Sequence, residues 1–267
     1  MKYILAFIFV VAIALGGAFL YFYSQVRFDA YTIIDYKPKL ATQIFDRNNE
    51  LIANIFEENR IYVKYNDIPP RVIEALVAIE DTSYFEHGGI NVEAMARAAI
   101  QDIKARKLVE GASTLTQQLI KNLALSREKK FTRKIKEVVL AMKLESELSK
   151  EDIIERYLNH VYFGHGYYGI KTAAEGYFRK ELNELSIKEI AMLVGMPKAP
   201  STYDPTKHLD LSLSRANRVL ERMYSIGWIN EDEYRKGVLE EPAVFDDTLT
   251  RNKAPYVVDE IIKEASK

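Results

Sequence analysis

A pair of acidic residues stands where a predicted apolar helix ends. Apolar residues recur at helical spacing from Arg71 to Ile79, and Glu80 and Asp81 follow directly, ahead of two aromatic residues, a histidine and two glycines. The carboxyl end of a helix dipole and apolar surroundings both disfavour a negative charge, so a carboxylate placed there is ready to accept a proton. Glu80 is therefore a candidate general base. The alternative is that both acids are solvated charges at a helix end.

A second segment, residues 111–122, gathers hydroxyl, amide and cationic side chains. Ser113 or Thr114 can cap the helix that is predicted to follow, and the first backbone amides of such a helix form an anion-binding surface. Gln118 and Lys121 are three residues apart in the sequence, so they share one face of that helix. The segment predicts a site for an anionic ligand, although an ordinary helix start carries the same residue types.

The following stretch, residues 121–136, is strongly basic, with seven lysine or arginine residues against one acid. At its end Arg133 and Lys134 come four and three residues before Glu137, so on a helix the two cations and the carboxylate share a face. Such a set would hold a pyrophosphate group well. Weak surface salt bridges or a solvated face are the alternatives. A nucleic-acid contact would need interleaved aromatic residues, and only Phe131 lies in this stretch.

The elements that must position these side chains are mostly helices. Ahead of them, Gln43–Phe45 and Leu51–Phe56 flank a turn-rich segment and predict a short β-hairpin, and residues 59–67 predict one more extended piece. Further stretches with amphipathic or wholly apolar helical patterns are residues 92–107, 114–123, 132–147, 150–159, 169–178, 187–196 and 212–226.

The N-terminus predicts a membrane anchor. No charged residue occurs from Tyr3 to Val26, and at ~1.5 Å per residue this stretch is long enough to cross a hydrocarbon core of ~30 Å. Aromatic residues at positions 21–23 suit the far interface, while Lys2 precedes the apolar run, so the globular part is expected outside the cytoplasm. A cleaved signal peptide is the alternative, although the apolar run is longer than such peptides use.

The composition agrees with a folded protein and excludes several kinds of site. The chain has 267 residues, is 48% hydrophobic and carries a formal net charge of -1, so no overall field attracts it to nucleic acid. The absence of cysteine excludes disulfides, thiolate catalysis and cysteine zinc sites. The four histidines lack the HExxH spacing of zinc hydrolases.

The motifs resemble, in order and spacing, those of family 51 peptidoglycan glycosyltransferases, the N-terminal catalytic part of class A penicillin-binding proteins. The similarity continues through residues 153–159, 162–164, 169–178 and 191–200 and covers roughly residues 40–236. The three principal motifs are Glu80-Asp81-x-x-Tyr-Phe-x-His-Gly, Gly111-x-Ser-Thr-x-Thr-Gln-Gln-x-x-Lys-Asn and Arg133-Lys-x-x-Glu137.

The resemblance implies a mainly α fold: a lysozyme-like large lobe and a smaller membrane-proximal lobe with a short N-terminal β-hairpin, preceded by one transmembrane helix. The expected domains are an anchor at residues 3–26, a glycosyltransferase domain at 27–240 and an exit segment at 241–267. Residues 254–259 resemble the passage into a transpeptidase domain. We therefore expect the natural protein to continue into that domain, and a monofunctional enzyme is the alternative.

The resemblance also implies an activity: polymerisation of lipid II into β-1,4-linked glycan strands, with inversion and release of undecaprenyl pyrophosphate. Glu80 matches the general base of this family. Glu137 matches a second carboxylate that positions the pyrophosphate, directly or through a cation. The residues implied to bind the substrate are Ser113, Thr114, Gln118, Lys121, Asn122, Arg127, Lys129, Arg133 and Lys134.

The implied location is the bacterial inner membrane, crossed once, with the catalytic domain on the periplasmic side. The implied partners are lipid II, the growing glycan chain, phosphoglycolipid inhibitors of the moenomycin class and other cell-wall synthesis proteins, with no nucleic acid. No cofactor is required, Mg²⁺ stays open as an accessory ion, and the sequence identifies no metal site. Apolar residues of Met95–Leu108 either enter the lipid headgroups or, as we favour, belong to the core.

Two other functions use some of the same residues. A lysozyme-like glycan hydrolase also places a glutamate at a helix end, but it needs neither the basic stretch nor a lipid substrate. A non-catalytic module that binds lipid anions would keep the basic stretch without needing Glu80.

Overall fold

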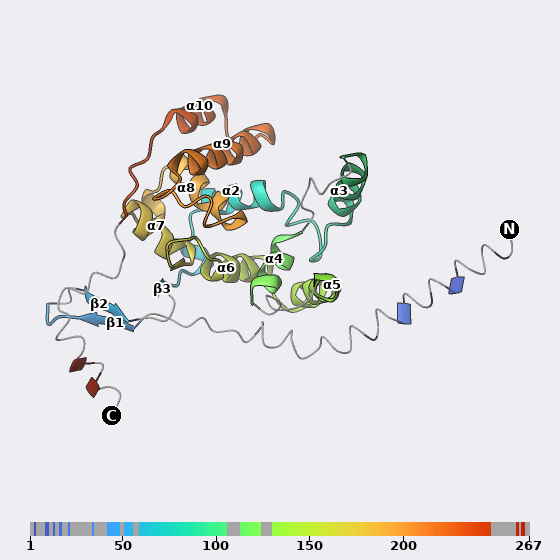
Figure 1. The fold of residues 1–267 in the computed structure, drawn as a ribbon, viewed down its shortest axis with the longest axis horizontal. Helices are drawn as coiled ribbons and strands as arrows, with labels where there is room; N and C mark the ends of the chain where they lie inside the picture. Colours follow the sequence, from blue (N-terminus) through green and yellow to red (C-terminus); the bar gives the residue numbers. More distant parts are fainter. Residues whose placement is uncertain are drawn as a thin grey trace. The chain divides into compact units, whose positions relative to one another are not determined.

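The computed structural model describes residues 42–48, 51–55, 59–105, 113–123 and 130–246, together with isolated positions nearer the two ends of the chain (Figure 1). Helices dominate the described part, so the predicted mainly α class is confirmed. The strands are β1 (Thr42–Phe45), β2 (Leu51–Ile55), β3 (Asn59–Arg60) and β4 (Tyr167–Tyr168). The α-helices are α2 (Pro70–Glu80), α3 (Val92–Ala105), α4 (Leu115–Leu123), α5 (Lys130–Glu147), α6 (Lys150–His160), α7 (Ile170–Phe178), α8 (Ile187–Gly195), α9 (Leu209–Ser225) and α10 (Glu231–Leu239). The 3-10 helices are η1 (Tyr65–Asp67), η2 (Leu182–Glu184) and η3 (Met196–Lys198).

The chain divides into two compact units. Unit 1 comprises Met1–Tyr36 and Ser83–Ile153, and unit 2 comprises Lys37–Thr82 and Ile154–Lys267. Unit 1 therefore holds α3, α4 and α5, whereas unit 2 holds α2 and all the elements from β4 to α10.

The core of unit 2 is built around α8. This helix packs against α2 and α9, and α9 in turn contacts α10; Figure 1 shows α8 and α9 side by side. All residues of α8 after Ile187 are buried, which is typical of a central helix that neighbours surround. A capping box fixes its start: the Ser186 hydroxyl accepts a hydrogen bond from the backbone N–H of Glu189, whose side chain accepts one from the Ser186 N–H.

Two small sheets complete unit 2. The segments predicted to form a hairpin are β1 and β2, which pair antiparallel with Thr42 opposite Ile55. The sequence did not indicate the second pairing, in which β3 lies parallel to β4. Arg60 of β3 is buried there, with its guanidinium 5.4 Å from the centre of the Tyr168 ring and donating a hydrogen bond to the backbone carbonyl of Asn159.

In unit 1, α4 packs against α5, and the loop of residues 83–91 is tied to the start of α6. The Tyr84 hydroxyl donates to the Lys150 carbonyl at 2.9 Å, and Lys150 Nζ donates to the His87 carbonyl at 2.6 Å. Gly89, with φ of +91°, lies so close to α5 that a Cβ there would come within 2.6 Å of the Ala141 carbonyl oxygen. Glycine is therefore required by both the backbone conformation and the space.

Several helix boundaries and one burial prediction differ from the structure. Helix α9 begins at Leu209, three residues before the predicted start, and α8 gives way to η3 at Met196, where Pro197 follows. Helix α10 was not predicted as a separate element, although Asn230 and Glu233 form the capping box that begins it. We expected the apolar residues of Met95–Leu108 to belong to the core. This prediction was wrong for Met95 and Ile100, because both side chains are exposed on α3.

The predicted anchor at residues 3–26 lies, apart from isolated positions, outside the described residues. Within the part of the chain that the structure describes, no helix has the length and apolar character needed to span a bilayer. The predicted exit segment is described from Glu241 to Asp246, where the Phe245 N–H donates to the Tyr177 carbonyl at 2.9 Å.

Candidate active site

Glu80 is the last residue of α2, as predicted. The helix ends there because Asp81 leaves the helical conformation, with φ of -161° and ψ of 74°, while its N–H still donates to the Val77 carbonyl. Apolar residues at helical spacing bury the preceding turns of α2 in unit 2, so the end of the helix is held firmly. The Glu80 side chain keeps 13% of its surface exposed.

A buried arginine lies beside this carboxylate. Nη2 of Arg215, on α9, is 3.6 Å from Glu80 Oε1. The Nε of Arg215 donates to the Gly195 carbonyl at 3.2 Å, and its guanidinium is 6.0 Å from the centre of the Tyr203 ring. The sequence did not point to Arg215, because no motif or helical spacing connects it with Glu80.

Tyr157 of α6 is a second titratable neighbour of Glu80. Complete burial is the main cause that raises the pKa of the Tyr157 hydroxyl, and the negative charge of Glu80 raises it further. The phenol therefore stays protonated and neutral throughout the physiological pH range.

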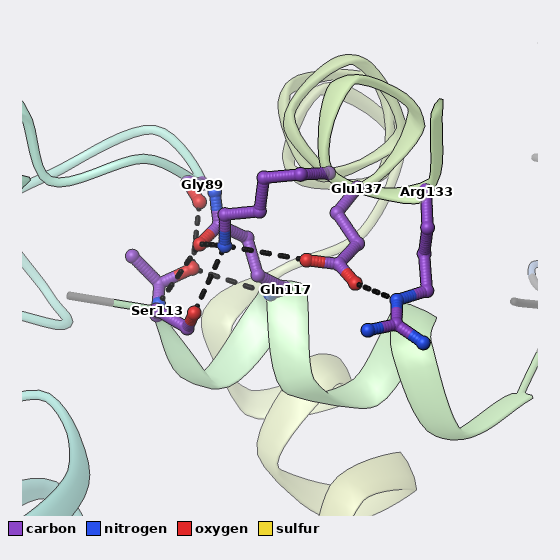
Figure 2. A network of polar contacts seen from close by, with 7 residues as sticks. Gly89, Ser113, Gln117, Arg133 and Glu137 are labelled. Atoms are coloured by element: carbon purple, nitrogen blue, oxygen red, sulfur yellow. Dashed lines mark hydrogen bonds and ion pairs between the residues drawn. The ribbon is translucent and has the colours of Figure 1, made fainter. Parts of the chain in front are cut away.

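A separate polar cluster lies in unit 1, where the second and third sequence motifs meet. Lys134 of α5 extends its Nζ to the Ser113 hydroxyl at 2.9 Å, to Gln117 Oε1 at 3.4 Å and to Glu137 Oε2 at 3.2 Å. Figure 2 shows Ser113 and Gln117 gathered beside the bend at Gly89. A cation from one helix thus reaches the start of another, and the contact joins the two motifs.

Glu137 is the centre of charge in this cluster. Its Oε1 pairs with Arg133 Nε at 3.3 Å and its Oε2 with Lys134 Nζ at 3.2 Å, so the two cations share its face of α5 as predicted (Figure 2). The alternative of two surface salt bridges is wrong for the carboxylate, because Glu137 is only 4% exposed. Burying a carboxylate is costly unless it is paired, so Glu137 depends on both cations and in turn fixes where they lie.

The start of α4 is held by a capping box. The Thr114 hydroxyl accepts from the Gln117 N–H, and Gln117 Oε1 accepts from the Thr114 N–H, each at 3.2 Å. The same hydroxyl donates to the Gly89 carbonyl at 2.7 Å. Thr114 was expected among the substrate ligands, but it is buried with its hydroxyl used as donor and acceptor, which is the role of a helix cap. Ser113, only partly buried, is the more accessible hydroxyl.

The sequence did not predict a series of polar contacts that joins α4 to α5 and to the start of α6. The Thr116 hydroxyl donates to Glu145 Oε1 at 2.6 Å, and Glu145 Oε2 pairs with Lys150 Nζ at 2.6 Å. Lys150 also lies over the Tyr84 ring, 4.3 Å from its centre. These contacts fix α4, α5 and the loop of residues 83–91 as one assembly within unit 1.

The remaining predicted ligands fall into two groups. Gln118, Lys121 and Asn122 are on α4, where Gln118 is partly buried and the other two are exposed. Arg127 and Lys129 lie outside the described residues. Gln117, which was not among the predicted ligands, accepts a hydrogen bond from Lys134 and also has a buried Nε2 without a hydrogen-bond partner. Among the described residues, no three histidine or acidic side chains are grouped as ligands of a metal ion.

Comparison with known proteins gives consistent matches. The Transglycosylase family model matches residues 48–224. Penicillin-binding protein 1F of Bacillus subtilis is 43% identical over 79% of this chain and 30% of its own length, and penicillin-binding protein 1A of Aquifex aeolicus is 44% identical over 75% and 28%. The crystal structure of penicillin-binding protein 1A from Haemophilus influenzae superposes with a TM-score of 0.50 at 27% identity, over 86% of this chain and 24% of that one.

The chain thus spans less than a third of the length of these relatives. The family match includes Glu80, the Ser113–Lys134 contact and Glu137, and it covers well over half of the 267 residues. The chain belongs to the transglycosylase family.

Proposed function

We propose that the chain is a peptidoglycan glycosyltransferase that polymerises lipid II. The observation that carries the proposal is the cluster in unit 1, in which two cations gather on a buried carboxylate and one of them reaches the hydroxyl of Ser113. A pyrophosphate needs charge-assisted hydrogen bonds from several donors at once, and this cluster supplies them beside the N-terminal amides of α4.

The proposed donor is the growing glycan chain on undecaprenyl pyrophosphate. Arg133 and Lys134 bind its pyrophosphate and offset the charge that develops on the leaving group, and Glu137 keeps both cations in place. Ser113 contributes its hydroxyl. Gln118, Lys121 and Asn122 of α4, with Arg127 and Lys129, complete the proposed set for the donor sugar and phosphates.

Glu80 is the proposed general base. The 4-hydroxyl of the GlcNAc of lipid II attacks the anomeric carbon of the donor, and Glu80 accepts the proton as the new C–O bond forms. The bond from the anomeric carbon to the pyrophosphate oxygen breaks, and undecaprenyl pyrophosphate leaves. A single displacement of this kind inverts the anomeric configuration and gives a β-1,4 link.

Mg²⁺ is not required on this proposal. Both oxygens of Glu137 are paired with cationic side chains, so charge neutralisation at the cluster comes from the protein. An Mg²⁺ ion that reaches this region would arrive as a counterion of the substrate pyrophosphate.

A membrane location follows from the proposed substrate, whose lipid tail stays in the bilayer. We propose that residues 3–26 anchor the chain in the bacterial inner membrane and that the catalytic part lies on the periplasmic side. Helix α3 suits the headgroup region, because Val92 and Ile100 are 68% and 54% exposed and Arg97 and Lys104 are exposed on the same helix. Moenomycin-class phosphoglycolipids and other cell-wall synthesis proteins are further proposed partners.

The test supplies the full chain with purified lipid II and, separately, with purified glycan strands. We expect lipid II to be converted into polymer with stoichiometric release of undecaprenyl pyrophosphate, and a moenomycin-class inhibitor to stop the reaction. Soluble fragments released from glycan strands, with no polymer from lipid II, would instead show a hydrolase. Binding of lipid II without turnover would show a non-catalytic module.

A further inference from the structure

The end of α2 has a cationic neighbour that does not belong to the motif around Glu80. Arg215 Nη2 and Glu80 Oε1 are 3.6 Å apart, and the two side chains are 7% and 13% exposed. We infer that Arg215 is a positioning residue: it holds the Glu80 carboxylate in one orientation, ready to accept the proton of the acceptor hydroxyl. The inference rests on the proposed function, since it requires Glu80 to be the base.

The guanidinium of Arg215 is held in place by its surroundings. Its Nε donates to the Gly195 carbonyl at 3.2 Å, while Nη2 is the atom that faces Glu80. A Cβ at Gly195 would lie 2.9 Å from Arg215 Cγ, so glycine at this position is what allows the arginine side chain to run past α8. The contact with Glu80 therefore depends on a specific path through the packing of α8 against α9.

Orientation explains why such a contact would serve catalysis. A buried ion pair contributes little net stability, because the loss of hydration offsets most of the attraction between the charges. A general base must lie within hydrogen-bond reach of the proton that it accepts. Arg215 is itself held by the Gly195 carbonyl, so its contact with Glu80 fixes the direction of the carboxylate at the end of α2.

The other groups around the end of α2 have different tasks. Tyr157 of α6 is a neutral phenol. On α9, Arg222 donates to the Ala78 carbonyl at 3.4 Å and to the Thr82 hydroxyl at 2.8 Å. Asp81, the next residue after Glu80, is buried at the C-cap of α2.

The experiment measures kcat and KM of the full chain for lipid II. Loss of the ion pair leaves the Glu80 carboxylate free to take other orientations, so in Arg215→Gln we expect kcat to fall by roughly 10- to 100-fold with KM unchanged. Arg215→Lys keeps a cation beside Glu80 and restores part of kcat.

Gly195→Ala provides a second route that leaves both charged residues in place. The added methyl displaces Arg215, and alanine is otherwise favoured over glycine in a helix, so the variant is expected to fold. Its kcat falls by a smaller amount than that of Arg215→Gln, and its KM is unchanged. If Arg215→Gln yields no folded protein, Gly195→Ala decides the question.

Arg222→Gln is the matched control, because it also removes an arginine that joins α9 to the end of α2. We expect it to lower the thermal midpoint without changing kcat or KM. Wild-type kcat in both Arg215→Gln and Gly195→Ala would overturn the inference, even if Glu80→Gln is inactive. Full activity of Glu80→Gln would instead overturn the proposed base, so the two failures are distinguishable.

Discussion

At the scale of single residues, the described part of the chain concentrates its proposed chemistry in a few charged side chains with specific partners. Glu137 is buried and paired with Arg133 and Lys134. The helical spacing of these three residues made their pairing predictable from the sequence. The contacts of Lys134 with Ser113 and of Arg215 with Glu80 join different helices, and only the packing of those helices reveals them.

Lys134→Ala tests the pyrophosphate site. Removing one charge-assisted hydrogen bond costs about 1.5–3 kcal/mol, so we expect kcat/KM for lipid II to fall by roughly 10- to 100-fold, with weaker binding of the substrate. Steady-state kinetics together with equilibrium binding of lipid II measure both effects.

Lys143→Ala is the control for this prediction. Lys143 is also on α5, nine residues after Lys134, and its Nζ pairs with Glu147. We expect near wild-type kinetics from this control. Equal losses in the two variants would show that the effect comes from α5 in general and would remove Lys134 from the proposed site.

At the scale of elements, the sequence predicted the helices that carry the motifs but not their fine boundaries. Amphipathic periodicity located α2 and α4 to within a residue or two. It left out the parallel pairing of β3 with β4, because two-residue strands carry no periodic pattern. The tight bend at Gly89 was also invisible, since the need for glycine there comes from the backbone of α5.

Gly89→Ala tests how the loop of residues 83–91 is held. The positive φ and the approach to the Ala141 carbonyl both oppose a side chain, so we expect a loss of about 1–3 kcal/mol in the free energy of unfolding. Gly88→Ala is the control, because a Cβ at Gly88 would meet nothing within 4 Å. Denaturant melts of both variants provide the measurement. Equal stability of the two would contradict the close packing of Gly89 on α5.

At the scale of the whole molecule, the sequence predicted the helical class, and the family match places the chain among the transglycosylases. The large lysozyme-like lobe, the smaller membrane-proximal lobe and the boundaries at residues 26 and 240 stay predictions. Burial on α3 could not be read from the sequence, because an apolar stripe has the same pattern whether it faces a protein core or lipid.

Ile100→Glu tests the proposed contact of α3 with the membrane. Transfer of an isoleucine side chain out of an apolar environment costs about 1.5–3 kcal/mol, so we expect roughly tenfold slower polymerisation in lipid vesicles. The rate with detergent-dispersed lipid II stays close to wild type. Leu239→Glu on α10 is the control, because Leu239 is also exposed to solvent, at 80% against 54% for Ile100, but belongs to unit 2. Equal rates for the two variants in vesicles would argue against the contact.

The most direct test of the account compares turnover with binding in Glu80→Gln. This substitution keeps the size and hydrogen-bonding capacity of the side chain but removes its ability to accept a proton. The account predicts that Glu80→Gln binds lipid II normally and forms no polymer, whereas Glu74→Gln, which changes a partly exposed acid on the same helix, polymerises at the wild-type rate. Polymer formation by Glu80→Gln at the wild-type rate would contradict the account.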